Sequence, residues 1–349
     1  MSQSPSSAAR SRPPFDVVGI GNAIVDVIAH ADDGFLQHND LVKGAMTLID
    51  APRAETLYQR MASGIESSGG SAANTMAGLA SLGGKAAFIG KVRDDPLGGI
   101  FRHDIQAAGV HFETPPATAG LPTARCLIFV TPDAQRTMQT FLGASVDLGP
   151  GDVDANLIGA SAVTYLEGYL WDKPEAKAAF QRAARIAHQA GRKVSLTLSD
   201  PFCVDRHRAD FRKLISGHVD LLFANEAEIQ SLYQTADFAA ASRQAGADCE
   251  VAALTRSEKG AVIVAGDEVH VIAAEPVPRV VDTTGAGDLY AAGFLFGYTQ
   301  GLPLTLCGRL GAIAAAEAIS HTGARPQARL ADLVAAKLGP LPAADRVKA

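Results

Sequence analysis

The stretch that decides the fold is VDTTGAGDLYAAGF, residues 281–294. A strand is expected to run into its Thr-Thr-Gly-Ala-Gly-Asp segment, and a helix of small residues begins inside the glycines. A helix that begins at such a turn leaves several backbone N–H groups without an intrahelical acceptor, next to the positive end of the helix dipole. The turn of Gly285, Ala286 and Gly287 therefore predicts an anion hole suited to a phosphoryl group.

Asp288 follows this glycine turn directly and is expected in the first turn of the helix. A carboxylate there can accept the proton of a hydroxyl group while the N–H groups stabilise charge on phosphoryl oxygens. A helix-capping aspartate behind a glycine turn is the simpler alternative, but it explains single residues and not the ordered string. Asp288 is therefore the candidate general base.

Strands and helices alternate along the second half of the chain. Predicted strands are 162–165, 194–198, 221–224 and 251–255, and predicted helices are 175–190, 206–215, 226–233, 286–300 and 303–320. This alternation predicts a mostly parallel α/β sheet with helices on both faces. Two earlier stretches, about 34–50 and 112–145, show strand patterns without helices and predict a small β lid.

The bulk composition excludes several classes of protein. Apolar residues make up 47% of the 349 residues and charged residues 19%, which indicates a folded core. The net charge of −6 lacks the positive excess typical of nucleic-acid binding. No apolar run approaches the roughly 18–20 residues of a membrane helix. The four cysteines are scattered, so we expect free thiols in a cytoplasmic protein, preceded by a disordered tail over residues 1–14.

Two signatures resemble those of the PfkB, or ribokinase-like, family of kinases. DTTGAGD at 282–288 resembles the C-terminal signature, and GGSAANTMAGLASLGGKAAFIGKVRDDPLGG at 69–99 resembles the N-terminal one. The resemblance covers nearly all of the chain after Pro14. It implies one ribokinase-like α/β domain over residues 15–349 with a small β-sheet lid. It also implies ATP as phosphoryl donor, Mg²⁺, and transfer to a hydroxyl of a sugar or nucleoside.

The resemblance assigns two groups of residues to the hydroxyls of the acceptor. Asn22 and Asp26, in GNAIVDV, resemble the family's sugar-contacting positions. An aspartate between apolar neighbours on a strand requires partners, which a sugar diol or a structural hydrogen bond would supply. Gly69, Gly70 and Asn74 resemble the second contacting group, in which glycines permit close backbone approach.

Other family features fall on the nucleotide side. Asn225 and Glu228 resemble the NxxE motif that orders the waters of Mg²⁺, although an acidic helix start is the alternative. Thr255 and Gly260 resemble a loop near ATP in which Ser257 here replaces a glycine. Gly285 and Gly287 complete the predicted ATP contacts.

Arg136, on the predicted lid hairpin, resembles an arginine that approaches the transferring phosphate, with a solvated surface arginine as the alternative. AISHTGARPQ, residues 318–327, resembles a loop whose carbonyls, with those beside Asp282, hold a monovalent cation such as K⁺. The cation-site residues that this implies are Asp282, Thr284, Ala318 and Gly323.

Three segments resemble those of adenosine kinases and favour a nucleoside as the acceptor. They place Phe202 in TLSDPF, Met138 in QRTMQTFLGA and Tyr169 in EGYLWDKPE. A nucleobase requires flat apolar walls, whereas a free hexose requires mostly polar ones. The sequence therefore favours an adenosine kinase of purine salvage, as a monomer or homodimer. A sugar kinase of the same fold and a non-catalytic ligand sensor remain the alternatives.

Overall fold

The structure is a computed structural model that describes residues 12–133 and 135–342. The tail predicted over residues 1–14 lies mostly outside this range. At its end, Arg12 donates a hydrogen bond of 2.7 Å to Asp16.

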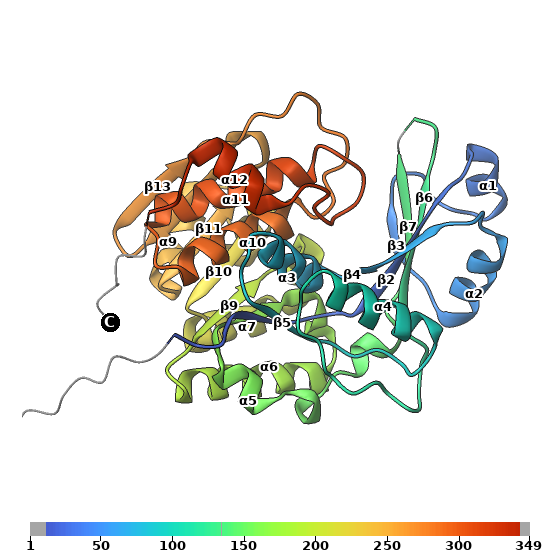
Figure 1. Ribbon diagram of the computed structural model, residues 1–349, viewed down its shortest axis with the longest axis horizontal. Helices are drawn as coiled ribbons and strands as arrows, with labels where there is room; N and C mark the ends of the chain where they lie inside the picture. The colour runs from blue at the N-terminus through green and yellow to red at the C-terminus, as the bar shows by residue number, and fades with distance from the viewer. Residues whose placement is uncertain (1–11, 134, 343–349) are drawn as a thin grey trace, which may run out of the picture.

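A large sheet forms the body of the molecule (Figure 1). Its strands are β1 (Phe15–Ile20), β5 (Ala86–Ile89), β8 (Ser161–Glu167), β9 (Lys193–Thr197), β10 (Leu221–Asn225), β11 (Val251–Thr255), β12 (Ala261–Ala265) and β13 (Glu268–Ile272). Within the described residues they lie in the order β13-β12-β11-β10-β9-β8-β1-β5. Neighbours from β5 to β11 run parallel, and β12 and β13 are antiparallel additions. The predicted mostly parallel α/β sheet is confirmed.

Helices cover both faces of this sheet, and each face has its own apolar core. One core contains α3 (Ser71–Ser81), α4 (Pro96–Ala107), α10 (Ala286–Thr299), α11 (Leu304–Ala318) and α12 (Leu330–Leu338). The other contains α5 (Ala155–Gly159), α6 (Pro174–Gln189), α7 (Pro201–His218), α8 (Glu226–Tyr233) and α9 (Phe238–Asp248). Along β1, Val17 enters the first core and Val18 the second, because successive side chains of a strand point to opposite faces.

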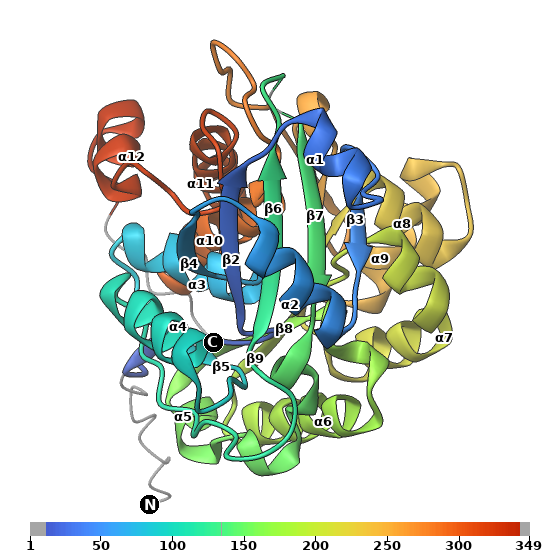
Figure 2. The ribbon, with the colours of Figure 1, turned by 90° about the vertical axis from the view of Figure 1, so that its right-hand side faces the viewer.

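A second sheet stands beside the first and faces the viewer in Figure 2. Its strands are β2 (Ile24–His30), β3 (Met46–Leu48), β4 (Ile65–Gly69), β6 (Ala124–Val130) and β7 (Arg136–Phe141), in the order β3-β7-β6-β2-β4. The helices α1 (Asp33–His38) and α2 (Ala51–Arg60) cover its outer face (Figure 1). Because β2 follows β1 after a short turn, the second sheet lies at the carboxyl ends of the parallel strands.

This second sheet draws on more of the chain than the predicted lid ranges. The ranges 34–50 and 112–145 supply β3, β6 and β7, whereas β2 and β4 lie outside them. Part of the first range is also helical, since the Asp32 side chain caps α1 by accepting a 2.7 Å hydrogen bond from the Phe35 amide. Residues 112–123 contribute only an isolated bridge, Arg93 to Ala117.

The strand expected to run into the glycine turn is absent from the described residues. Residues 273–285 form an irregular segment in which Val280 is exposed and Pro276 and Pro278 lack the N–H that a strand would use. The Val281 amide instead donates to the Ile319 carbonyl at 2.8 Å. The glycine turn is therefore held by the loop after α11 and not by a sheet.

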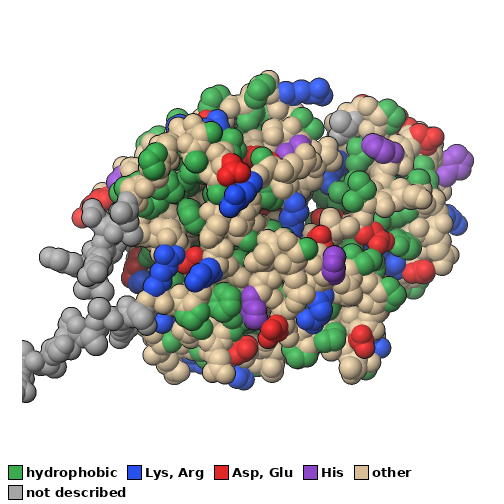
Figure 3. Space-filling model, viewed as in Figure 1, with side chains coloured by type: hydrophobic (Ala, Val, Ile, Leu, Met, Phe, Trp, Pro, Cys, Tyr) green, Lys and Arg blue, Asp and Glu red, His purple; other side chains and the backbone are tan. Residues whose placement is uncertain are grey.

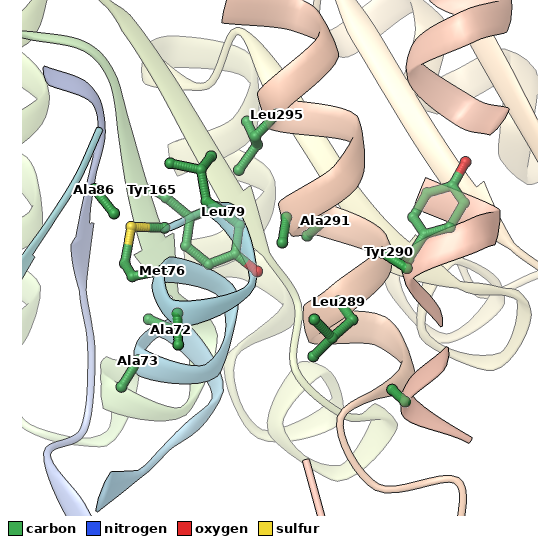
Figure 4. Close-up of a cluster of buried hydrophobic side chains, with 14 of the residues drawn as sticks. Ala72, Ala73, Met76, Leu79, Ala86, Tyr165, Leu289, Tyr290, Ala291 and Leu295 are labelled. Atoms are coloured by element: carbon green, nitrogen blue, oxygen red, sulfur yellow. The ribbon is translucent and has the colours of Figure 1, made fainter. Parts of the chain in front are cut away.

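Small residues bring α3 and α10 into close contact, as Figure 4 shows. A Cβ added to Gly78 of α3 would lie 2.5 Å from Leu289 Cδ1 and 2.9 Å from Ala292 Cβ of α10. The buried side chain of Met76 lies on the other side of α3, where it packs against Gly19 of β1. The close packing fixes the N-terminal turns of the two helices relative to each other.

In the part of the chain that the structure describes, none of the helices combines the length and the apolar character that crossing a membrane requires.

Candidate active site

The glycine turn before α10 has the backbone geometry of an anion hole. Gly285 is the N-cap residue of α10 with φ +77°, and its position has no room for a side chain, because a Cβ would lie 2.6 Å from Ala324 Cβ. No side chain caps the helix. Among the described residues, the amides of Gly285, Gly287 and Asp288 have no hydrogen-bond acceptor, whereas the Ala286 amide donates to the Thr283 carbonyl at 3.2 Å. Such uncapped amides can bind a phosphoryl group.

Asp288 lies in the first turn of α10, where α3 holds its side chain. Ser71 Oγ donates to Asp288 Oδ1 at 2.6 Å, and Asn74 Nδ2 donates to Oδ2 at 3.0 Å. Burial raises the pKa of Asp288, and these two hydrogen bonds with the charge of Arg325 oppose the rise. Asn74 Oδ1 is buried without a partner in the described residues, so it remains free to accept a hydrogen bond. Sequence analysis did not select Ser71, although the residue lies inside the quoted signature.

Asp26, on β2, faces the same site from the second sheet. Its carboxylate packs on Gly69, where an added Cβ would lie 2.4 Å from Asp26 Oδ2. Burial raises the pKa of Asp26 to about 6, although Arg325 and Arg136 oppose the shift. The structural hydrogen bond that was the alternative for Asp26 does not occur among the described residues.

Asn22 differs from the expected free sugar contact. Its Nδ2 donates to Glu167 Oε1 at 2.7 Å, and its Oδ1 accepts from Ser145 Oγ at 2.8 Å. The side chain is buried, so the protein already uses both of its polar atoms. In this structure Asn22 shapes the β1–β2 turn, and a direct contact with an acceptor stays a prediction.

Glu167 is a site residue that the sequence analysis missed. It ends β8, is buried, and accepts hydrogen bonds from the Asn22 and Ala72 amides at 3.3 and 2.8 Å. Burial raises its pKa to about 7, against the hydrogen bonds that favour the charged form. The only sequence signal was an isolated glutamate at the end of an apolar strand.

Arg136 connects the second sheet to the segment that leads into the glycine turn. Its guanidinium forms a buried ion pair with Asp282 and donates to Thr284 Oγ1 at 3.1 Å. Asp282 also accepts from the Gly323 amide at 2.9 Å, and its pKa is lowered because these hydrogen bonds outweigh its burial. The alternative of a solvated surface arginine is wrong, because Arg136 is buried against the turn that precedes Gly285.

Several polar groups at the predicted monovalent-cation site already form hydrogen bonds within the protein. The Asp282 carboxylate is bound by Arg136, Thr284 and Gly323. Ala318 is the last residue of α11, and the next carbonyl, that of Ile319, accepts from the Val281 amide. A cation held by carbonyls of these segments stays a prediction.

Two of the residues predicted for ATP, Asn225 and Thr255, line a cleft at the carboxyl ends of β10 and β11, whereas Gly260, Gly285 and Gly287 are not part of its lining. The cleft has a volume of about 430 Å³ and is lined by Asn225, Glu226, Ala227, Gln230, Thr255, Arg256 and Ser257. Ser257 has φ +50°, a left-handed conformation that glycine adopts without strain, which explains the glycine of the resembling loop. Gly260, with φ +83°, leaves no room for a side chain beside the Ile272 carbonyl.

Asn225 and Glu228 form a reciprocal cap at the start of α8. The Asn225 side chain accepts from the Glu228 amide at 2.9 Å, and Glu228 accepts from the amide of Asn225 at 2.9 Å. Glu228 is buried, which raises its pKa to about 7, with Asp200 and Asp288 adding to the rise. The alternative of a solvated acidic helix start is therefore wrong for Glu228, though Asn225 is exposed.

The residues predicted to wall a base occupy separate elements around the site. Met138 lies on β7, Tyr169 in the short helix Gly168–Asp172, and Phe202 in the first turn of α7, which begins five residues earlier than predicted. Asp200 and Pro201 start this helix, since Asp200 Oδ1 accepts from the Cys203 amide at 2.7 Å. Phe202 is 76% exposed, whereas the Tyr169 hydroxyl donates to the Ser199 carbonyl at 3.2 Å.

The register of the second sheet places further apolar side chains beside Met138. Met46 pairs with Met138 and Leu48 with Thr140, and paired residues of neighbouring strands share a face. Arg136 belongs to the same face, and its ion pair with Asp282 shows that this face turns toward the large sheet. Met46 and Leu48 are 48% and 55% exposed there. The strand-like pattern of LVKGAMTLI, residues 41–49 within the predicted stretch 34–50, was the signal that could have found them.

The space-filling view shows the surface hollowed between the body and the second sheet (Figure 3). Positive and negative side chains are interspersed on the face in view. A carboxylate beside uncapped helix amides, under a second sheet with an arginine, has the parts that phosphoryl transfer to a hydroxyl requires.

Comparison with known proteins agrees with an enzyme that transfers a phosphoryl group to a hydroxyl. The chain belongs to the PfkB family, because the model described as pfkB family carbohydrate kinase matches residues 42–329. It is therefore a kinase of the group that phosphorylates sugars and nucleosides.

Two solved structures share more than half of their sequence with this chain. A probable sugar kinase from Rhizobium etli CFN 42 is 55% identical, with a TM-score of 0.86 over 93% of this chain and 98% of its own. The adenosine kinase of Sinorhizobium meliloti is also 55% identical, with a TM-score of 0.86 over 92% of this chain and 99% of its own. An uncharacterized sugar kinase of Archaeoglobus fulgidus is 30% identical over 71% of this chain and 96% of its own.

Proposed function

We propose that this protein transfers the γ-phosphoryl group of ATP to the 5′-hydroxyl of a nucleoside, with adenosine as the preferred acceptor. One observation carries the proposal. Asp288 is fixed by Ser71 and Asn74 in the same helical turn that presents uncapped amides, so a proton acceptor and an anion site adjoin. An intact pair of this kind also disfavours the alternative of a silent ligand sensor.

The reaction follows from these positions. Asp288 accepts the proton of the acceptor hydroxyl, and the oxygen attacks the γ-phosphorus. The bond from the γ-phosphorus to the β–γ bridging oxygen breaks, and ADP leaves with that electron pair. The free amides of Gly285 and Gly287 face the charge on the transferring group, whereas the predicted Ala286 amide donates to the Thr283 carbonyl in this structure. Closure of the second sheet would exclude water, which otherwise competes as the acceptor.

Mg²⁺ would neutralise charge on the phosphates when it is bound with ATP. In the described part of the chain, His, Cys, Asp and Glu side chains form no group of three that could hold a metal ion. The residues present therefore fit an ion whose ligands are mostly phosphate oxygens and waters. Glu228 and Asn225 are the side chains that would orient such waters.

The sugar hydroxyls of the acceptor have two unsatisfied partners in the site. Asp26 offers a carboxylate without a protein donor, and Asn74 Oδ1 is a buried acceptor without a partner in the described residues. Both are acceptors, so they suit the two O–H donors of a ribose diol. They do not separate ribose from a nucleoside, because both carry these hydroxyls.

The apolar residues around the site favour a nucleoside over a free sugar. Met46 and Leu48, together with Met138, give the inner face of the second sheet an apolar surface, and Phe202 is exposed at the carboxyl end of β9. A base could cover these side chains, whereas a free sugar would leave them in contact with water. The names of the two relatives at 55% identity, a sugar kinase and an adenosine kinase, leave the choice to experiment.

We expect adenosine to exceed ribose in kcat/KM by about one to two orders of magnitude, since base–aromatic stacking contributes roughly 1–3 kcal/mol. Phe202→Ala should lower kcat/KM for adenosine more than it lowers any residual kcat/KM for a sugar. The measurement is kcat/KM for adenosine, guanosine, inosine, cytidine, ribose, fructose and fructose 6-phosphate under one set of conditions. Val271→Ala, which removes an equally exposed side chain on the edge strand β13, is the matched control. A sugar or sugar phosphate as the best acceptor would make the nucleoside assignment wrong.

Arg136→Ala should lower kcat and kcat/KM together and leave the KM for ATP nearly unchanged. An arginine that meets charge mainly in the transition state has this kinetic signature. Arg125→Ala provides the control, because Arg125 is similarly buried in the second sheet but pairs with Glu55 on the outer face. An unchanged kcat in Arg136→Ala would reduce the role of Arg136 to joining the sheet to the core.

A further inference from the structure

Arg325 joins the second sheet to the catalytic helix pair. Its Nε and Nη2 donate to the Ser68 carbonyl and Ser68 Oγ at 3.1 and 2.9 Å. Its Nη1 donates to the Ala73 carbonyl at 3.1 Å. Ser68 belongs to β4 of the second sheet, whereas Ala73 belongs to α3 of the body. One planar guanidinium therefore bridges two segments that belong to different layers.

The bridged segments flank the connection that carries the acceptor site. Gly69 and Gly70 lie between Ser68 and α3, and Gly70 has φ +98°. A Cβ on Gly70 would lie 2.1 Å from the Asn22 carbonyl oxygen, so this connection also touches the β1–β2 turn. Ser71 and Asn74, which hold Asp288, follow at once in the same helix. A shift at this connection would displace Ser71 and Asn74, the two residues that hold the Asp288 carboxylate.

Both ends of the bridge are themselves anchored. Asp104 of α4 accepts from the amide and the hydroxyl of Ser68 at 2.7 and 2.5 Å. On the other side, Glu317 Oε1 accepts from the amides of Gln327 and Ala328 at 2.9 and 2.8 Å, which fixes the loop that carries Arg325. Because both ends of the bridge are anchored, the Arg325 guanidinium is held in a fixed position.

The same loop contacts the catalytic turn. Ala324 packs where a side chain on Gly285 would lie, and the Gly323 amide donates to Asp282 at 2.9 Å. The short segment from Gly323 to Arg325 therefore links three parts: the glycine turn, the first turn of α3 and the strand β4.

Arg325 is also the positive charge that acts on both carboxylates of the site. Its field favours the charged forms of Asp26 and Asp288, whereas the charge of Asp288 adds to the rise in the pKa of Asp26. Burial lowers the pKa of Arg325 to about 10, so it stays charged at neutral pH.

We propose that Arg325 is a positioning residue for the phosphoryl transfer: it fixes the β4–α3 connection, and with it Ser71 and Asn74, against the catalytic turn. The proposal rests on the proposed function, in which Asp288 is the base and Asp26 binds the acceptor. Sequence analysis had read the AISHTGARPQ segment for its carbonyls and not for this side chain.

The experiment compares Arg325→Lys and Arg325→Met with the wild-type enzyme. Lysine keeps the charge but cannot form the planar fork that bridges Ser68 and Ala73. We expect Arg325→Lys to lower kcat/KM for the acceptor by about 10²-fold, since small misplacements of reacting groups have effects of this size. The KM for ATP should change by less than about twofold, because the ATP cleft lies at the ends of β10 and β11.

The pH profile separates charge from geometry. Asp288 contacts Ser71 and Asn74, and the charged or titratable groups around it are Arg325, Asp26, Glu167, Glu228, Tyr165 and Tyr169. Without the positive charge, the pKa of Asp288 rises, and the base loses its proton only at higher pH. We therefore expect the acid limb of kcat/KM to move upward in Arg325→Met and to stay near its wild-type position in Arg325→Lys.

Arg102 provides matched controls. It donates to the carbonyls of Phe112 and Thr114 at 3.3 and 2.7 Å, so it also joins backbone segments, but it acts on neither Asp26 nor Asp288. Arg102→Lys and Arg102→Met should keep the wild-type kinetics and pH profile. Thermal unfolding of all four variants shows whether loss of stability differs between the two positions.

A readout without substrate keeps this proposal distinct from the proposed function. Amide hydrogen exchange over residues 65–75 should increase in Arg325→Met relative to Arg102→Met, whatever the acceptor is. If the wild-type protein phosphorylates none of the acceptors, the proposed function fails while the exchange result still tests the bridge. Wild-type acceptor kinetics in both Arg325 variants, or unchanged exchange over residues 65–75, would overturn the role of Arg325.

Discussion

Asp288→Asn should reduce kcat by about 10²–10⁴-fold, the range typical of lost general-base catalysis. The substitution preserves the shape of the side chain, and its amide oxygen can still accept a hydrogen bond from Asn74 or Ser71. Acceptor affinity should therefore change little, because the groups that would bind the sugar hydroxyls, Asp26 and Asn74, remain in place. The measurement is steady-state kinetics with binding of the acceptor determined separately.

The pH dependence of the wild-type enzyme provides a second check on the same residue. Burial raises the pKa of Asp288, so the proton is released at a higher pH than from an exposed aspartate. Only the deprotonated form can act as a base, and kcat/KM should therefore rise with pH through this raised pKa. Asp152→Asn, at an aspartate bound to Lys91 outside the site, serves as the control. A kcat above a tenth of the wild-type value in Asp288→Asn would rule out Asp288 as the base.

Gly285→Ala should lower kcat by about 10²–10³-fold, the loss typical when a donor to a charged transition state is removed. Gly285 has φ +77°, and an added Cβ would approach Ala324 Cβ, Cα and O to 2.6, 2.8 and 2.9 Å. These atoms include backbone, which cannot move aside as a flexible side chain would. The turn must therefore shift, and its amides lose their alignment toward the phosphoryl group.

Gly83→Ala is the control for backbone strain alone. Gly83 has φ +88°, but an added Cβ there meets no heavy atom within 4 Å. Both variants should therefore lose roughly 1–3 kcal/mol of stability from the left-handed conformation, and only Gly285→Ala should lose activity beyond that. Equal kcat values for the two variants, measured well below their unfolding temperatures, would contradict an anion hole at Gly285.

Local patterns in the sequence predicted most of the architecture. The alternation of apolar strands with helices gave the mostly parallel sheet, because each such segment carries its own periodicity and its own turn residues. The prediction was wrong where context decided. Asp32 caps the unpredicted helix α1 in a stretch expected to be strand, and α7 begins at Pro201 and not at Arg206. The strand before the glycine turn was also wrong, since its Val281 amide bonds to the Ile319 carbonyl.

The residues of the site also divide into those that the sequence predicted and those that it did not. Asp288 and the glycine turn were predictable, because a helix N-terminus and the residue that follows its glycines are neighbours in sequence. Ser71, Glu167 and Arg325 were not selected, because their partners are 217, 145 and 257 residues away, respectively. The periodicity of a sequence gives no information about contacts between residues that are so far apart in the chain.

The sequence by itself determined the local chemistry of this protein: a glycine turn at the start of a helix, an aspartate in the first helical turn, and the kinase family to which both belong. Only the tertiary structure decided which distant groups act on them. The small residues of α3 and α10 allow the close approach that gives Asp288 its hydrogen bonds, and the partly buried Arg136 and Arg325 join the second sheet to the body. The physical reason is that burial and ionic pairing depend on what packs against a residue, whereas a turn or a helix start depends mainly on the residues beside it.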